Sequence, residues 1–97
     1  MIRQETLFHI RGLADVDLYF EHLEAVNYEI AAYQKVAELI GEATTINLLS
    51  EVDIVVYEQK LTYALTNFRN CLNFRLHYAL VMNQRIALQR AEKENVI

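Results

Sequence analysis

The sequence predicts an all-α protein in which an antiparallel helical hairpin with a long C-terminal helix assembles into a helical bundle. The 97 residues contain no proline and only two glycines, Gly12 and Gly41, so few positions interrupt a helix. Apolar residues recur three and four positions apart, which is the spacing of one helix face. Hydrophobic residues make up 54% of the chain, more than one short domain buries easily, and this excess predicts association.

We expect a single domain over 1–97 that begins with a short N-terminal element over 2–11. Gly12 follows this element, in the position where glycine commonly ends a helix. Asp15 comes shortly after and offers a carboxylate that can cap the N-terminus of a second helix. These two residues predict a break between the short element and the helix that follows.

The second helix is predicted over about 15–40 and is expected to end at Gly41. One apolar stripe keeps the a and d spacing of packed helices for more than three heptads. It comprises Val16, Tyr19, Leu23, Val26, Ile30, Tyr33, Ala37 and Ile40. A second apolar line widens the surface beyond the needs of a two-stranded coiled coil and comprises Leu18, Ala25, Ala32 and Leu39. The first stripe is therefore expected to be buried, and a bundle is the predicted setting.

The third segment has neither glycine nor proline and is predicted as a long helix or a helix pair over about 45–94. Thr44 or Thr45 is the expected cap. Its strand-preferring stretch EVDIVVYEQ is assigned to the helix because its apolar residues join those that follow at helical spacing. Asparagine is a weak helix former and leaves a break near Asn70 open. An apolar stripe crosses that point and favours one continuous helix; it comprises Leu61, Leu65, Phe68, Leu72, Leu76 and Ala79.

Charge is divided unevenly along the chain. Residues 15–42 contain seven acidic residues and one basic residue, a net charge of −6, whereas residues 59–97 contain six basic and two acidic residues, a net charge of +4. Since opposite charges attract, Arg75 and Arg85 are expected to pair with acids of the second helix or of a partner chain. The bases are too sparse for the clustered face that nucleic acids require, so no nucleic-acid partner is expected.

Several classes of function lack the residues that they need. No apolar run approaches the roughly 18–20 residues of a membrane span, and no signal-peptide cleavage site follows the N-terminal stretch, so we expect a cytoplasmic protein without a membrane partner. Ser50 is the only serine and has neither a nearby histidine nor a glycine elbow. Two glycines cannot form a phosphate-binding loop. We therefore expect no enzyme, no catalytic residue and no cofactor.

The stretch NYEIAAYQKVAELIGEATTINLLSEV, residues 27–52, resembles ferritin-like stress proteins of the bacterial four-helix type. This resemblance implies a di-iron or di-manganese site made of inward-pointing glutamates and Glu-x-x-His pairs. Val26 and Asn27 stand where the family would place a Glu-His pair, and no histidine of this chain has a glutamate three residues before it. The alternative that remains is a site of carboxylates alone, formed by Glu29, Glu51 and Glu58.

Glu29 lies at the flank of the first stripe, where a charge ordinarily guides the choice of partner. The sequence therefore predicts a non-enzymatic interaction module, an adaptor, small chaperone or regulator, that forms a homo-oligomer such as a dimer or binds a helical partner protein. Its predicted interface comprises Tyr19, Val26, Ile30, Tyr33, Leu61, Leu65, Phe68, Leu72, Leu76 and Ala79. The alternatives are a ferritin-like carboxylate metal-binding bundle and a helix that binds nucleic acid through the C-terminal arginines.

Overall fold

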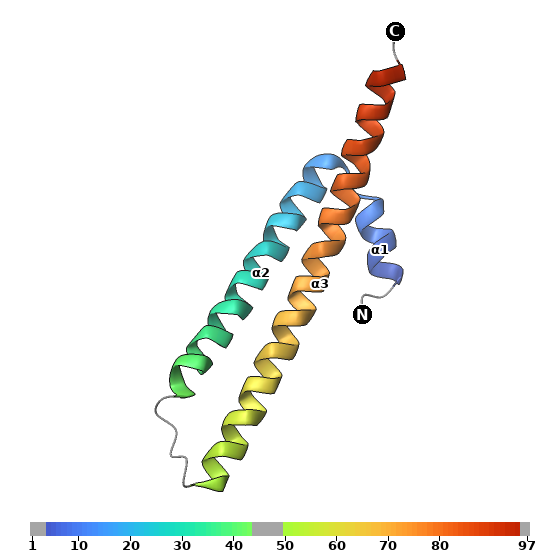
Figure 1. The fold of residues 1–97 in the computed structure, drawn as a ribbon. Coiled ribbons are helices and arrows are strands. Elements are labelled where there is room, and N and C mark those ends of the chain that lie inside the picture. Colours follow the sequence, from blue (N-terminus) through green and yellow to red (C-terminus); the bar gives the residue numbers. More distant parts are fainter. Residues whose placement is uncertain (1–3, 44–49, 96–97) are drawn as a thin grey trace.

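The described part of the chain is built from helices alone. The structure, a computed structural model, describes residues 4–43 and 50–95. These residues form three helices, α1 (Gln4–Arg11), α2 (Asp15–Glu42) and α3 (Glu51–Asn95), and no strand (Figure 1). The all-α class is confirmed, and the stretch EVDIVVYEQ is helical throughout.

The turn between α1 and α2 is formed by Gly12, Leu13 and Ala14. The backbone N–H of Gly12 donates to the carbonyl oxygens of Phe8, at 3.1 Å, and His9, at 3.2 Å, so α1 ends where Gly12 predicts. The prediction that Asp15 caps α2 is wrong, because Ala14 occupies the N-cap without any side-chain hydrogen bond. Asp15 is the first helical residue instead, where its charge is favourable to the helix dipole.

The C-terminus of α2 also differs from the prediction. Gly41 lies inside the helix, which ends at Glu42, and Ala43 follows in right-handed helical geometry with its N–H bonded to the Ile40 carbonyl. No described glycine has a positive φ. Gly41 therefore does not provide the left-handed conformation through which glycine commonly stops a helix.

The first described residue of the third segment, Ser50, caps α3. Its Oγ accepts a hydrogen bond from the backbone N–H of Asp53, at 3.3 Å, which is the geometry of an N-cap residue. The helix itself begins at Glu51. The prediction of a start near residue 45 with Thr44 or Thr45 as the cap lies outside the described residues.

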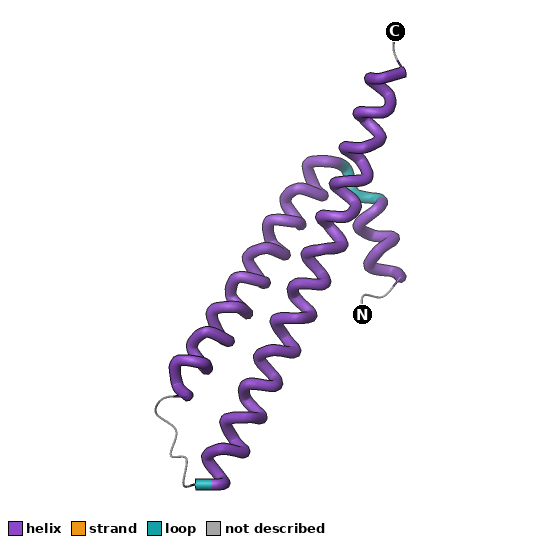
Figure 2. Tube along the Cα trace, in the orientation of Figure 1, coloured by secondary structure: helices purple, strands orange, loops and turns teal. Residues whose placement is uncertain are grey.

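α3 is one continuous helix of 45 residues and does not break near Asn70. At 1.5 Å per residue it is roughly 68 Å long, against roughly 42 Å for α2. The longest dimension of the chain, 72 Å, is thus the length of this helix. Arg85 of α3 is hydrogen-bonded to Asp15, the first residue of α2, and the part of α3 that follows, residues 86–95, extends past α2 as an overhang (Figure 2).

α2 and α3 lie side by side and run in opposite directions (Figure 1). The contacts that define their register pair Asp15 with Arg85, Glu29 with Arg75 and Leu39 with Tyr57. The residues of α2 that are buried against this pairing are Leu18, Ala25, Ala32, Val36 and Leu39. The second apolar line of the sequence, with Val36 added, is therefore the line that packs within the chain.

The expectation that the first apolar stripe of α2 is buried is wrong for the single chain. Six of its eight members have large exposed side chains: Val16, Tyr19, Leu23, Ile30, Tyr33 and Ile40. The physical reason lies in side-chain size. The alanines of the second line let the α2 backbone approach α3, whereas tyrosines at the same positions would hold the helices apart.

The core consists of two clusters that follow one another along the helix pair. One joins all three helices and contains Ile10, Leu18, Ala25, Tyr78 and Val81. The other lies nearer the α2–α3 connection and contains Val36, Leu39 and Ala64, with Tyr57, Leu61 and Phe68 packed against them. Along the sequence of α2 and α3, Glu29 and Arg75 fall between the two clusters.

Candidate interaction face

The two apolar stripes predicted from the sequence lie on the same side of the α2–α3 pair. Successive residues of a helix are about 100° apart around its axis. On α2, the centre of the first stripe is roughly 120° from the line of buried residues that contacts α3. On α3, the centre of the stripe is roughly 80° from the line that contacts α2, which includes Ala64, Arg75 and Tyr78. Both rotations have the same sense, and in two antiparallel right-handed helices this brings the stripes to one side. The rings of Tyr33 and Phe68, whose centroids are 6.0 Å apart, join the stripes across the pair.

We name this side the apolar face. Its members are Tyr19, Leu23, Val26, Ile30, Tyr33, Ala37, Ile40, Leu61, Leu65, Phe68, Leu72, Leu76 and Ala79. It includes all ten residues predicted for an interface. Among these ten, Tyr19, Ile30, Tyr33, Leu65 and Leu76 are exposed, Tyr33 by 59%. The other five are half-buried.

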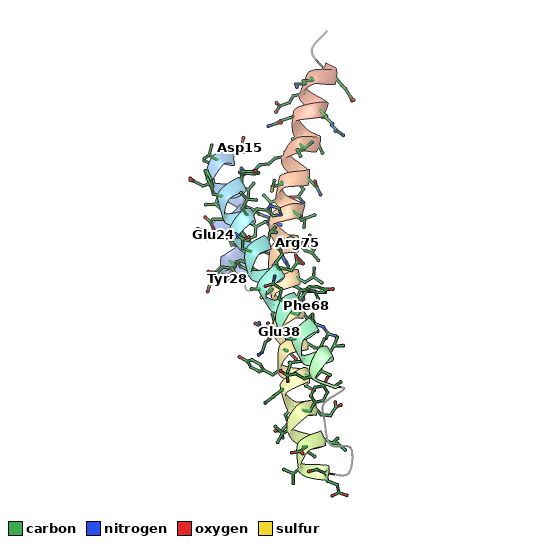
Figure 3. The ribbon with its side chains drawn as sticks, turned by 90° about the vertical axis from the view of Figure 1, so that its left-hand side faces the viewer. Asp15, Glu24, Tyr28, Glu38, Phe68 and Arg75 are labelled. Carbon is green, nitrogen blue, oxygen red and sulfur yellow. The ribbon has the colours of Figure 1, made fainter. Side chains whose placement is uncertain are left out.

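α1 packs on the other side of the helix pair. Ile10 is fully buried in the cluster that includes Tyr78 and Val81, and His9 Nε2 lies 3.0 Å from Glu21 Oε1. These α2 and α3 residues are rotated away from the apolar face in the opposite sense. Figure 3 shows Glu24 and Tyr28 on one edge of the pair and Phe68 on the other. In the described part of the chain, α1 therefore covers one side of the pair and the apolar face stays uncovered.

The dimensions of the chain agree with an uncovered face. Its radius of gyration is 19.5 Å, whereas a compact domain of this length has a value of roughly 13 Å. It exposes 7742 Å², whereas a compact monomer of the same mass exposes roughly 5,700 Å². The difference, about 2,000 Å², exceeds the roughly 800 Å² that each partner buries in a standard-size interface.

An ion pair between Glu29 and Arg75 crosses the helix pair at its middle. Arg75 Nε and Nη2 each donate to one carboxylate oxygen of Glu29 at 2.9 Å, and the side chains are only 15% exposed for Glu29 and 26% for Arg75. The hydrogen bonds to Glu29 raise the pKa of Arg75 above its ordinary value. The expectation that Glu29 guides partner choice is therefore wrong, because its carboxylate is held within the chain.

Arg85 of α3 is bonded to the start of α2 and to the turn before it. Its Nη1 donates to Asp15 Oδ1 at 2.7 Å, and its Nη2 donates to the carbonyl oxygens of Leu13 at 2.6 Å and Arg11 at 3.1 Å. One guanidinium thus fixes the turn between α1 and α2 against α3. The predicted pairing of Arg75 and Arg85 with acids of the second helix is confirmed for both residues.

A smaller polar contact ties the three helices together at Glu21. The Tyr78 hydroxyl donates to Glu21 Oε1 at 3.1 Å, and His9 Nε2 approaches the same oxygen. Burial, followed by the hydrogen bond to Glu21, raises the pKa of Tyr78 to about 12. Because the phenol stays neutral well above physiological pH, this contact is structural.

The structure does not bring together the carboxylates of the metal hypothesis. Glu29 is bound by Arg75, and Glu58 lies 17 residues before Arg75 on α3, roughly 25 Å along the helix. Glu51 lies two turns further still. Over residues 4–43 and 50–95, no group of three or more His, Cys, Asp or Glu side chains is placed to hold a metal ion.

The arginines of the nucleic-acid alternative are also dispersed. Arg75 and Arg85 are engaged by carboxylates of α2. In the segment 67–93 of α3, the exposed bases that remain are Arg69, Arg90 and Lys93. They are spread over 24 residues, roughly 36 Å of helix. They do not form the clustered basic face that binds a phosphate backbone.

No family model, curated protein or solved structure matches this chain. Within the described residues, no helix combines the length and the apolar character needed to cross a membrane.

Proposed function

We propose that the chain is a non-enzymatic interaction module, an adaptor, small chaperone or regulator, that associates with other helices through the apolar face. One observation carries this proposal: the exposed stripes of α2 and α3 share one side of the pair, and α1 covers the other. An antiparallel hairpin with one apolar side is half of a four-helix bundle. Covering that side removes apolar surface from water, which is the main driving force of association.

The ion pair between Glu29 and Arg75 has a part in this function. A bidentate arginine–carboxylate contact is directional, so it favours one register of α2 against α3 over a slip by a turn. The register in turn sets Tyr33 level with Phe68. We infer that the pair keeps the two stripes aligned so that they present a single surface.

Changing two exposed leucines of the apolar face tests the proposal. Leu65→Glu with Leu76→Glu places charges on the face, while both side chains are 44–46% exposed and belong to neither core cluster. We expect the dissociation constant to rise by a factor on the order of 100 or more, because each copy in an assembly then buries two charges. Sedimentation velocity at micromolar concentration measures the change, and circular dichroism checks that the helices persist.

The matched control is Tyr28→Glu with Tyr63→Glu, which changes two exposed apolar residues outside the face. This variant is expected to associate as the wild type does. Retention of the wild-type mass by the leucine variant would refute the proposed face. Equal dissociation of both variants would also refute it, since the effect would then not depend on where the charges are placed.

A further inference from the structure

We propose that the apolar face is covered by a second copy of this chain, with the two α3 helices antiparallel about a two-fold axis near Leu72. This inference rests on the proposed function and names its partner. A two-fold interface must be self-complementary, so that each residue that meets another is met by it in return. Along α3, acids near one end and bases near the other suit such a pairing.

A series of residues seven apart runs along α3, and its three central members belong to the apolar face. From the N-terminal end it reads Glu51, Glu58, Leu65, Leu72, Ala79, Ile86 and Lys93. A left-handed supercoil keeps residues at this spacing in one seam. The series begins with two acids, continues with four apolar residues and ends with a base, and its middle member is Leu72.

Antiparallel pairing about Leu72 matches the two ends of this series. Lys93 of one copy is then opposite Glu51 of the other, Ile86 is opposite Glu58, and Arg90 lies four residues, roughly 6 Å along the axis, from Glu58. Glu51, Glu58, Arg90 and Lys93 are exposed, and none of the four has an ion-pair partner in the described chain. A parallel arrangement would instead place Glu51, Glu58 and Lys93 beside their own copies.

The overhang of α3 gives a second, independent reason for this arrangement. Residues 86–95 are roughly 15 Å of helix beyond α2, and an isolated helix of that length is marginal in water. The midpoint of α3, residue 73, falls next to Leu72. Antiparallel pairing there lays each overhang along the first two turns of the partner's α3, so that neither is left unsupported.

The two acids of the overhang differ in their relation to the seam. Glu92 lies about 100° round the helix from Lys93, on the side away from the face. Glu94 lies about 100° from Lys93 in the other sense, on the side of the face and one residue past the position opposite Glu51. Arg90 and Lys93 together outnumber Glu94, so the seam is acidic at one end of α3 and net basic at the other.

Exchanging the charges of the two ends tests the arrangement. Variant A carries Arg90→Glu and Lys93→Glu, and variant B carries Glu51→Lys and Glu58→Lys. Each alone places like charges at both ends of the seam, and we expect its dissociation constant to rise by about tenfold or more at low salt. An equimolar mixture of A and B restores opposite charges at both ends and is expected to associate as tightly as the wild type.

A control with the same change of charge as variant B is Glu24→Lys with Glu38→Lys on the outer side of α2, which is expected to leave association unchanged. If the mixture of A and B associates no more tightly than either variant alone, the antiparallel seam is wrong. This outcome leaves the proposed function intact as long as the wild type associates. A monomeric wild type would overturn both.

A distance measurement gives a readout that does not depend on charge. A spin label attached to a cysteine introduced by Gln89→Cys, in a Cys71→Ala background, reports the separation between the two overhangs. The antiparallel pairing predicts about 50 Å between the labels, since each lies 17 residues from the axis. A parallel pairing predicts less than about 25 Å, and this shorter distance would contradict the proposal.

Discussion

Replacing Leu18 with alanine is expected to lower the free energy of unfolding by about 3 kcal/mol. The Leu18 side chain is 2% exposed and packs in the cluster with Ile10, Ala25 and Tyr78, which joins the three helices. The change removes buried apolar atoms and leaves a cavity that the surrounding helices fill only in part. Urea unfolding followed by circular dichroism, at one fixed protein concentration, measures the loss.

The control for this change is Leu88→Ala. Leu88 is 64% exposed in the overhang, and its replacement is expected to change the free energy of unfolding by less than about 0.5 kcal/mol. A loss of under 1 kcal/mol for Leu18→Ala would be inconsistent with the second apolar line as the contact between α2 and α3. The fixed concentration is needed because association adds to the apparent stability.

Removing either partner of the central ion pair is expected to cost about 2 kcal/mol of unfolding free energy. Glu29→Ala leaves the Arg75 guanidinium without its carboxylate, and Arg75→Ala leaves the Glu29 carboxylate without its donors, at a half-buried site. The same urea unfolding experiment measures both single variants. A loss below 0.5 kcal/mol in both would mean that water replaces the partner at no cost.

Replacing both residues separates the cost of an unpaired charge from the value of the pair. Glu29→Leu combined with Arg75→Leu leaves no unpaired charge and lets the two core clusters join, so stability is expected to return to within about 1 kcal/mol of the wild type. If the pair sets the register of the helices, this double variant recovers stability but associates more weakly than the wild type. Unchanged association would argue against that role.

The helical class, the end of α1 and the continuity of α3 could be predicted from local chemistry. Gly12 ends α1, and the stripe through Leu72 carries α3 past Asn70 without a break. The predictions that Gly41 ends α2 and that Asp15 caps it rest on how often these residue types occupy such positions, and both are wrong for a local reason. The helix continues past Gly41 because no left-handed conformation is needed there, and the carboxylate of Asp15 is bonded to Arg85.

The choice between the two apolar lines of α2 could not be made from periodicity. Both lines have helical spacing, and spacing does not identify the neighbour that each line meets. Residue size distinguishes them, since Ala25 and Ala32 permit a close approach that Tyr19 and Tyr33 prevent. Val36 was missed because it lies between the members of the second line rather than at seven-residue spacing.

The composition of the apolar face could be predicted, but its position could not. The sequence indicates one stripe on each helix, and whether they lie on the same side depends on the register of α2 against α3. That register depends on pairs such as Glu29 with Arg75, which are 46 residues apart in the chain. The charge asymmetry predicted that such pairs form without indicating which acid each arginine meets.

The central claim is that one copy of this chain leaves a face that another chain must cover. The native mass of the purified wild-type protein tests it most directly, by sedimentation equilibrium or light scattering at micromolar concentration. We predict twice the chain mass of 11.3 kDa, with dissociation only on dilution. A folded particle with the mass of one chain, unfolding cooperatively at the same temperature at every concentration, would contradict the account.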